Sequence, residues 1–300
     1  MDVVTGAFSF TGRYIAARLL DLGREVRTLT RKQQEEDPFG GRVKATRPDF
    51  ADPARLAEAL DGTDTVYNTH WIRFPRADVT FATAVGNTEA LFSAAREAGV
   101  RRLVQLSVTN ASADSPLPYF RAKAAAELAL AGSGLSYAVV RPTLVFGRGE
   151  ILVNNIAWLL RKLPLFVVPG SGRYAVQPVA VEDVAELSVE AGLGDRDAVL
   201  DAAGPAAFAF EDLVRQIRDA IGARAMLVHG PPSLALALSR PLGRLAGGTL
   251  LTRDELEGLM ESLLVSKGNP TGKRRFEDWL TASASSLGAR FGSDLSRPWS

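Results

Sequence analysis

A regular alternation of strand-like and helix-like segments over the first two thirds of the chain limits what it can fold into. Short runs of β-branched and apolar residues are followed by longer segments in which apolar residues recur at helical spacing. Such alternation predicts parallel strands joined by helices, and these helices must cover both faces of the sheet. The sequence therefore predicts the α/β fold class, with a doubly wound parallel sheet.

The alternation also sets the expected division of the chain. We expect residues 1–150 to form the core that contains the sheet, and residues 151–300 to form a smaller, mostly helical part, of which 181–222 partly returns to the core. Ligands of such sheets bind beyond the carboxyl ends of the strands, so the second part is expected to pack over that edge. The expected strands are 2–6, 25–31, 42–47, 64–71, 101–108, 136–147 and 198–204, and the main helices are 12–23, 52–62, 79–99, 119–134, 151–163, 181–192 and 210–222.

Composition and charge exclude several classes of function. The 300 residues carry 35 basic and 34 acidic side chains, so the net charge of +1 gives no electrostatic footprint for nucleic acid. There is no cysteine, which excludes a disulfide framework. The two histidines stand in no metal-binding spacing, so we expect no metal site.

The late stretch 231–251 is strongly apolar, but Arg240, Pro241 and Arg244 interrupt it. These interruptions make it a poor candidate for a membrane span and leave a surface-lying helix as the alternative. Because the first strand begins at Asp2, we expect no signal peptide and a cytoplasmic protein. The expected partner is a small-molecule substrate, and the oligomeric state is left open.

The first strand runs into the sequence VVTGAFSFTG, a pattern typical of a turn that holds a dinucleotide pyrophosphate. Gly6 would supply the tight turn after the strand, and Gly12 would let the following helix pack closely on the sheet. Ser9 stands between them, where a small residue is needed, and its hydroxyl can donate to a phosphate oxygen. The alternative is an ordinary strand-to-helix turn that binds nothing.

The end of the second strand predicts which dinucleotide binds. A carboxylate there would accept from a ribose 2′-hydroxyl, but the sequence has Thr30, Arg31 and Lys32. A guanidinium suits a 2′-phosphate, so NADP(H) is favoured over NAD(H), unless the segment is only a solvated basic turn. After the third strand, Asp49 can accept from the adenine amine and Phe50 can flank the ring, unless they only form a helix-entry loop.

Tyr119 and Lys123 are four residues apart on one predicted helix, so both side chains project from the same face. A nearby ammonium favours the phenolate and lowers the pKa of the tyrosine. The phenol can then act as a general acid or base near neutral pH, and the lysine can also hold the ribose hydroxyls of a nicotinamide cofactor. The pair is therefore the candidate catalytic centre.

A resemblance to the short-chain dehydrogenase/reductase superfamily lies in the ordered segments TGAFSFTG, LTR, PDF, VYNTHW, GNTEALFSAAREAGVRRLVQLSV, YFRAK and VVRPTLVFG. The segments look most like the extended and atypical branches of the NAD-dependent epimerase/dehydratase type. Within these they are similar to the group that contains the nucleotide-binding accessory subunit of respiratory complex I. The resemblance covers about residues 1–190. It implies a Rossmann-type sheet that binds a nicotinamide dinucleotide.

The resemblance also implies roles for individual residues. The cofactor residues that it implies are Gly6, Ser9, Phe10, Thr11 and Gly12 for the pyrophosphate, Arg31 with Lys32 for the 2′-phosphate, Asp49 and Phe50 for adenine, and Asn68, Thr69, Ser107, Lys123, Pro142 and Thr143 toward the ribose and nicotinamide. Tyr119 and Lys123 match the acid/base tyrosine and its lysine.

One position departs from the family pattern. Enzymes of the family place a serine or threonine just past the fifth strand, where this chain has Val108, which cannot donate a hydrogen bond. Ser107 and Thr109 flank this position, and Thr109 is the best substitute. The interval from the strand to Tyr119 is also short for an extended enzyme. These departures count against catalysis by this chain, but they do not count against cofactor binding.

Residues that follow the fourth strand lie where a substrate would bind. His70 can be a second proton carrier, Arg73 can meet an anionic substrate, and Trp71 stands between them. Asn155, in a later helix, would line the roof of the pocket. The alternative is that His70 and Trp71 only pack the loop over the cofactor.

The sequence thus predicts an NADP(H)-dependent oxidoreductase that acts on a carbonyl or alcohol of a small molecule. A regulatory, sensor or assembly protein that binds NADP(H) without turnover is the alternative, and Val108 motivates it. A nucleotide-sugar epimerase or dehydratase is a further alternative. A weaker one is association with a membrane surface or a complex through 231–251.

Overall fold

The computed structural model describes residues 1–30, 37–76 and 79–293, which fall into two compact units. The first unit holds Met1–Pro142 and Val181–Ala202. The second holds Thr143–Ala180 and the described residues from Ala203 onward. The segment Val181–Ala202 therefore returns to the first unit after the chain has entered the second.

A seven-stranded parallel sheet forms the centre of the first unit, in the order β11-β6-β5-β4-β1-β2-β3. This sheet confirms the predicted α/β class. The strand order reverses between β1 and β4, and ligands of such sheets bind in the crevice at that reversal. The strands are β1 (Asp2–Thr5), β2 (Val26–Leu29), β3 (Val43–Thr46), β4 (Thr65–Asn68), β5 (Arg102–Leu106), β6 (Ser136–Pro142) and β11 (Ala198–Ala202).

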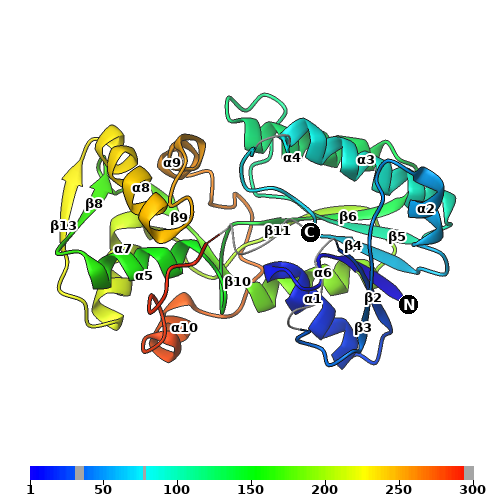
Figure 1. Cartoon of the computed structure of the whole chain (residues 1–300), viewed down its shortest axis with the longest axis horizontal. Coiled ribbons are helices and arrows are strands. Elements are labelled where there is room, and N and C mark those ends of the chain that lie inside the picture. The colour runs from blue at the N-terminus through cyan, green and yellow to red at the C-terminus, as the bar shows by residue number, and fades with distance from the viewer. Residues whose placement is uncertain (31–36, 77–78, 294–300) are drawn as a thin grey trace. The chain divides into compact units, whose positions relative to one another are not determined.

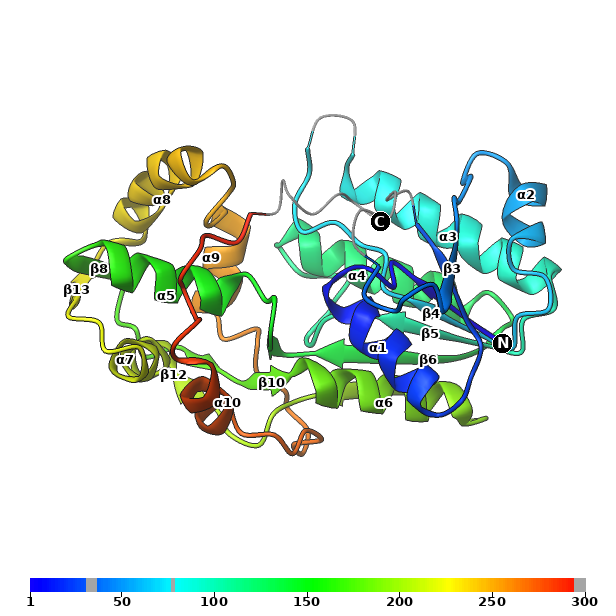
Figure 2. The ribbon, with the colours of Figure 1, turned by 60° about the horizontal axis from the view of Figure 1, so that its bottom comes forward.

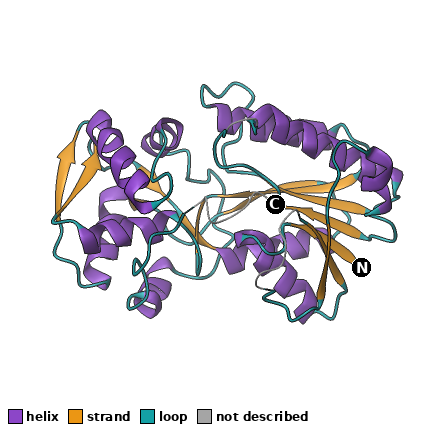
Figure 3. Cartoon of the chain, in the orientation of Figure 1, coloured by secondary structure: helices purple, strands orange, loops and turns teal. Residues whose placement is uncertain are grey.

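Helices cover both faces of this sheet (Figures 1 and 3). Figure 1 shows α1 and α6 on one face and α2, α3 and α4 on the other. Buried leucines such as Leu91, Leu103 and Leu130 fill the space between the sheet and the second group of helices. The helices are α1 (Phe10–Asp21), α2 (Pro53–Glu58), α3 (Phe81–Glu97), α4 (Pro118–Ala131) and α6 (Val181–Leu193).

Local sequence signals place the ends of two of these helices. Asp52 caps α2, because its carboxylate accepts from the amide of Arg55 at 3.2 Å. Gly23 follows the end of α1 with a φ of 74°, in the left-handed region that favours glycine. Both residues lie at the ends of the helices predicted over 12–23 and 52–62.

Two arginines at the start of β5 hold the carboxyl end of α6. Arg102 is 2% exposed and donates to the carbonyl of Ala191 at 2.7 Å, and Arg101 donates to that of Gly192 at 2.9 Å. Cations are favourable at this end of a helix, where the carbonyls have no helical partners. A Cβ on Gly192 would lie 2.2 Å from the hydroxyl oxygen of Tyr67, so the helix packs closely on β4.

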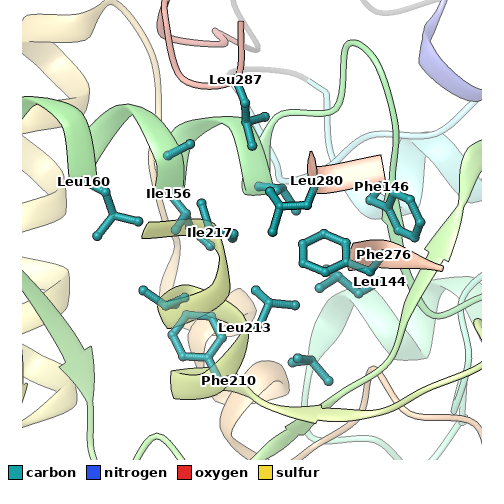
Figure 4. Packing of buried hydrophobic residues seen from close by; sticks show 14 of the residues in the cluster. Leu144, Phe146, Ile156, Leu160, Phe210, Leu213, Ile217, Phe276, Leu280 and Leu287 are labelled. Atoms are coloured by element: carbon teal, nitrogen blue, oxygen red, sulfur yellow. The ribbon is translucent and has the colours of Figure 1, made fainter. Parts of the chain in front are cut away.

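The second unit has its own hydrophobic core, which α5, α7 and α10 surround together with short strands (Figure 4). Its strands form three two-stranded sheets. The paired strands are β7 (Leu144–Phe146) with β10 (Pro178–Ala180), β9 (Ala175–Val176) with β12 (Phe208–Ala209), and β8 (Leu165–Pro169) with β13 (Met226–Gly230). The helices are α5 (Leu152–Lys162), α7 (Phe210–Ala220), α8 (Pro232–Ala246), α9 (Arg253–Met260) and α10 (Phe276–Ser283).

The expectation of one strand over 136–147 is wrong. β6 ends at Pro142, and β7 begins at Leu144 in a different sheet. The amide of Leu144 donates to the carbonyl of Gln177 at 3.2 Å, so the chain leaves the large sheet at Thr143. A continuous apolar run cannot reveal which partner strand each part will meet.

No helix in the described ranges is both long and apolar enough to traverse a lipid bilayer. Within the same ranges, the structure brings together no group of three or more side chains suited to hold a metal ion.

Asp64 joins the start of β4 to its neighbours and gives a pH-dependent contribution to stability. Its carboxylate accepts from Arg101 at 2.8 Å and from Arg24 at 2.9 Å, and the bond from Arg101 lowers the pKa of Asp64 to about 2. Because the pKa of Asp64 is lower in the folded than in the unfolded chain, the ionised carboxylate stabilises the fold at pH values above about 4, which is the pKa of an aspartate in the unfolded chain. This contribution is lost as the pH falls toward 2.

We therefore expect Asp64→Asn to lower the free energy of unfolding at pH 7 by about 1 kcal/mol or less, because the group is partly exposed. The difference from the parent should shrink as the pH falls to about 3, measured by urea unfolding. Asp61→Asn, at an exposed aspartate three residues earlier, is the control. Equal losses for both variants at pH 7 would contradict a specific role for Asp64.

Candidate cofactor and active site

The turn after β1 is built around Gly6, whose φ of 67° lies in the left-handed region. The amide and the hydroxyl of Ser9 both donate to the carbonyl of Gly6, at 2.8 and 2.6 Å. From the neighbouring strand, the hydroxyl of Thr28 accepts from the amide of Ala7 at 3.0 Å. The protein's own side chains therefore hold the turn in shape.

Ser9 is the N-cap residue of α1, yet its side chain does not cap the helix. Its hydroxyl donates to Gly6, whereas the sequence suggested donation to a phosphate. The amides of the first turn, at Phe10, Thr11 and Gly12, have no side-chain cap. Uncapped amides at a helix N-terminus are what an anion-binding turn requires.

Gly12 allows α1 to approach the turn more closely than any other residue would. A Cβ at this position would lie 2.2 Å from the carbonyl oxygen of Gly6 and 3.1 Å from Oγ1 of Thr69. Only a residue without a side chain fits here. Gly12 therefore lets the N-terminus of α1 lie directly against the Gly6 turn, which is the close packing that a dinucleotide-binding turn requires.

A chain of buried polar side chains crosses the carboxyl ends of three strands. Thr5 of β1 donates to Oδ1 of Asn68 on β4, and Nδ2 of Asn68 donates to Oε1 of Gln105 on β5, both at 2.8 Å. All three residues are at most 2% exposed. The side chain of Asn68 thus links β4 to β1 and β5. Thr69 adds a second link between β4 and β1, because its Oγ1 donates to the carbonyl of Thr5 at 2.5 Å.

Gln105 is a member of this chain that sequence reasoning missed. Its Nε2 donates to the carbonyl of Leu106 at 3.0 Å, so it fixes the end of β5. The available signal was an amide side chain inside an otherwise apolar strand, because a buried polar group needs partners.

Lys123 reaches the same strand end from α4. Its side chain is 3% exposed, and its amine donates to the carbonyl of Leu106 at 2.9 Å. Burial lowers the pKa of Lys123 to about 7, against a smaller opposing effect of the Glu127 carboxylate. Tyr119 lies one turn earlier on α4 and packs edge-on against Phe81, with ring centres 5.9 Å apart.

Trp71 covers the amine of Lys123. The Nζ atom lies 4.2 Å from the centre of the indole ring, a distance at which the ring face attracts a cation. Trp71, which the sequence placed near a substrate, therefore belongs to the surroundings of the candidate catalytic lysine.

Ser107 and Thr109 differ in what their hydroxyls contact. Ser107 is 7% exposed, and its buried Oγ has no hydrogen-bond partner within the described part of the chain. Thr109 has no exposed surface, and its Oγ1 donates to Asp201 at 3.3 Å. The sequence predicts Thr109 as the substitute for the donor missing at Val108, but the geometry favours Ser107, whose hydroxyl has no partner among the described residues.

The residues predicted to flank adenine lie next to a residue predicted to meet substrate. The rings of Phe50 and His70 stack, with centres 5.6 Å apart and planes at 29°. Asp49 is exposed, and its Oδ1 accepts from the amide of Ala51 at 3.1 Å. Arg31 and Lys32, predicted to read the 2′-phosphate, lie outside the described residues.

The remaining candidates have internal contacts. The guanidinium of Arg73 lies 5.5 Å from the ring centre of Phe74. Asn155 is 3% exposed, its Nδ2 donates to the carbonyl of Gly292 at 2.9 Å, and its Oδ1 accepts from the amide of Gly292 at 2.8 Å. This pairing ties α5 to Gly292 and differs from the expected place in a pocket roof. Pro142 ends β6, and Thr143, 5% exposed, follows it.

Residues 6–150 match the family model of NAD(P)H-binding domains. The matched range begins at the Gly6 turn and includes Tyr119 and Lys123. Residues 6–150 therefore form an NAD(P)H-binding domain, and the parallel sheet of the first unit has the Rossmann-type fold. The resemblance that the ordered sequence motifs indicated is thereby confirmed.

Relatives of this chain include a subunit of an NADH dehydrogenase and a reductase. NADH dehydrogenase (ubiquinone) 1 alpha subcomplex subunit 9 of Arabidopsis thaliana is 28% identical over 250 residues, 79% of this chain and 62% of that protein. The chain thus spans less than two thirds of the plant protein's length. A (4-alkanoyl-5-oxo-2,5-dihydrofuran-3-yl)methyl phosphate reductase of Streptomyces griseus is 28% identical over 300 residues, 93% of this chain and 96% of that protein.

Solved structures share the fold at lower sequence identity. An NADPH-dependent quinone oxidoreductase from Escherichia coli superimposes with a TM-score of 0.75 at 20% identity, over 96% of this chain and 99% of that one. A nucleoside-diphosphate-sugar epimerase from Staphylococcus aureus gives a TM-score of 0.75 at 17% identity, over 93% and 99%. At these identities the likeness shows the fold.

The close approach at Gly12 predicts a specific effect of substitution. We expect Gly12→Ala to weaken binding of reduced nicotinamide dinucleotide by at least about tenfold, because the new Cβ must push α1 away from Gly6. Titration followed by nicotinamide fluorescence measures the change. Gly86→Ala is the matched control, because a Cβ on this glycine of α3 meets nothing within 4 Å. Unchanged affinity in a folded Gly12→Ala protein would contradict a role for the close packing of α1 on the Gly6 turn in dinucleotide binding.

Proposed function

We propose that the protein is an NADP(H)-dependent oxidoreductase that reduces a carbonyl or oxidises an alcohol in a small molecule. The observation that carries the proposal lies at the end of β5. There the buried amine of Lys123 binds the carbonyl of Leu106, and the next residue, Ser107, presents a buried hydroxyl without a partner among the described residues. An amine and an unsatisfied hydroxyl at a ligand-binding edge suit proton transfer to a bound oxygen.

The first unit fits a nicotinamide dinucleotide. The uncapped amides at the start of α1 would hold the pyrophosphate, and Gly12 lets the helix that carries them lie directly against the Gly6 turn. Phe50 and His70 form a stacked aromatic surface that would flank adenine. We assign the 2′-phosphate to Arg31 and Lys32, on their sequence position after β2. When bound, the nicotinamide supplies or accepts the hydride.

The chain's own residues would handle the proton. Tyr119 donates its phenolic proton to the carbonyl oxygen during reduction and takes it back during oxidation. Ser107 donates a hydrogen bond to the same oxygen and thereby stabilises the charge that develops on it. Lys123 holds the ribose hydroxyls and, when protonated, favours the phenolate of Tyr119.

The lowered pKa of Lys123 makes this arrangement sensitive to pH near neutrality. With a pKa of about 7, the amine loses its proton within the range in which enzymes usually work. The indole of Trp71 opposes this loss, because its face attracts the charged form. Reduction is therefore expected to decline as the pH rises through the titration of this amine.

The similar proteins differ in how strongly they support the proposed reductase activity. The Streptomyces protein named as a reductase aligns over nearly the whole length of both chains. The quinone oxidoreductase and the sugar-nucleotide epimerase share the fold, so epimerisation of a sugar nucleotide is a less supported alternative.

A protein that binds NADP(H) without turnover is the second candidate, and a specific observation favours it. Trp71 lies on the amine of Lys123, which must be reachable for a ribose, and Val108 places an apolar side chain where family enzymes have a donor. Tight NADPH binding with no turnover of quinones, aldehydes, ketones or the corresponding alcohols would favour this candidate.

The cofactor preference can be tested directly. We expect NADPH to bind at least about tenfold more tightly than NADH, a difference of about 1.4 kcal/mol. Arg31→Ala should remove this preference by weakening NADPH binding and leaving NADH binding unchanged, because only NADPH carries the 2′-phosphate. Arg224→Ala, at an exposed arginine of the second unit, is the control. Equal affinities in the parent protein would contradict the assignment.

The catalytic roles predict a separation of binding from turnover. Ser107→Ala is expected to lower kcat by about 10²–10³ because it removes a donor to the developing charge. Tyr119→Phe should abolish turnover, and both variants should keep the parent affinity for NADPH. Ser93→Ala, at an exposed serine of α3, is the control. Retained turnover in Tyr119→Phe would overturn the mechanism, and loss of NADPH binding in either variant would point to a structural role.

A further inference from the structure

The segment from residue 220 to residue 253 has an unusual charge pattern. It contains four arginines, one histidine and no aspartate or glutamate, although the whole chain has almost equal numbers of basic and acidic residues. It also contains no phenylalanine, tyrosine or tryptophan. Most of the segment is β13 and α8, both in the second unit (Figure 2). Two of these basic groups lie against acids outside the segment, His229 against Glu211 and Arg253 against Glu257, so any attraction to anionic partners rests on the remaining arginines.

Helix α8 presents an apolar stripe to solvent. Leu234 and Leu238 are each 43% exposed, and Ala237 and Pro241 are exposed between and after them. Residues spaced by three and four positions share one side of a helix, so these four form a single stripe. Exposed large apolar side chains in a continuous row indicate an interaction surface.

A basic edge runs beside this stripe. Arg240 and Arg244 are one turn apart and exposed, and they are the only charged residues of α8. Successive residues of an α-helix are rotated by about 100° around its axis. Arg240 and Arg244 therefore lie on the side of the helix next to Ala237. The opposite side packs toward β8 and holds partly buried residues such as Ala235 and Leu242. The exposed half of α8 is therefore divided lengthwise into an apolar stripe and a basic edge.

We propose that α8 binds to the surface of an anionic lipid bilayer, with the helix axis parallel to the membrane plane. Leu234 and Leu238 would enter the boundary between headgroups and acyl chains. Arg240 and Arg244 have long stems that let their charged ends reach the lipid phosphates beside the helix. The attachment is peripheral, and the rest of the second unit stays above the headgroups.

The composition of the surface favours lipid over a protein partner. Protein interfaces depend on a few buried anchors, most often tryptophan, tyrosine and arginine, within a well-packed centre. The stripe offers only two leucines, an alanine and a proline in a flat row. A fluid bilayer accepts such a row without a complementary pocket, and the arginines supply attraction to anionic headgroups.

The small number of side chains that would contact the bilayer sets the expected strength of membrane binding. Two leucines and two arginines give weak, reversible binding that needs both the apolar and the electrostatic part. Binding should therefore fall steeply with added salt and with removal of phosphatidylserine.

Cosedimentation of the full chain with vesicles tests the proposal. Vesicles of phosphatidylcholine with about a third phosphatidylserine are compared with pure phosphatidylcholine at low salt. We expect binding only to the anionic vesicles. Leu234→Ser/Leu238→Ser should abolish it, and Arg240→Gln should reduce the partition coefficient about fivefold. The matched control is Leu22→Ser/Leu193→Ser, which replaces leucines that are 44% and 49% exposed in the first unit. Circular dichroism and the Tm of each variant verify folding.

Three results would overturn the proposal. One is no binding of the parent protein to anionic vesicles at low salt. The second is equal loss of binding in the matched control, which would mean that general surface apolarity is responsible. The third is concentration-dependent dimerisation of the parent without vesicle binding, abolished by Leu234→Ser/Leu238→Ser, which would assign the stripe to a second copy of the chain.

Discussion

The contact between α1 and the turn before it determines where the ligand-binding edge lies. A Cβ on Gly12 would be 2.2 Å from the carbonyl oxygen of Gly6, so the helix N-terminus sits directly against the backbone of the turn. Thr69, from the end of β4, meets the same point. The contact thus brings together the two strands between which the sheet order reverses, and it aims uncapped amides at that crevice.

The polar chain along the strand ends extends this edge toward the candidate catalytic centre. Hydrogen bonds run from Thr5 through Asn68 to Gln105, which donates to the carbonyl that also receives the amine of Lys123. Buried polar groups tolerate little displacement, because a broken bond leaves a desolvated group without a partner. The strand that leads into the Gly6 turn and the amine of Lys123 are therefore joined by hydrogen bonds between adjacent strand ends.

Sequence reasoning succeeded where local chemistry decides the structure. The alternating segments and the glycines at positions 6 and 12 each follow from short-range constraints, and the structure shows all of them. It failed where the outcome depends on which segments become neighbours. The break at Thr143, the role of Gln105 and the stacking of His70 on Phe50 all arise from contacts between distant positions, and no local pattern encodes them.

The burial of Lys123 supports its proposed role in the site. Its lowered pKa means that the fold disfavours the charged amine, so the residue costs stability at neutral and acid pH. A methionine would fill the same space without that cost. The neighbouring Ser107 adds a second cost, because its buried hydroxyl lacks a partner within the described residues. Two unfavourable groups on either side of Leu106, at the carboxyl end of β5, support the proposal that a bound molecule contacts both of them.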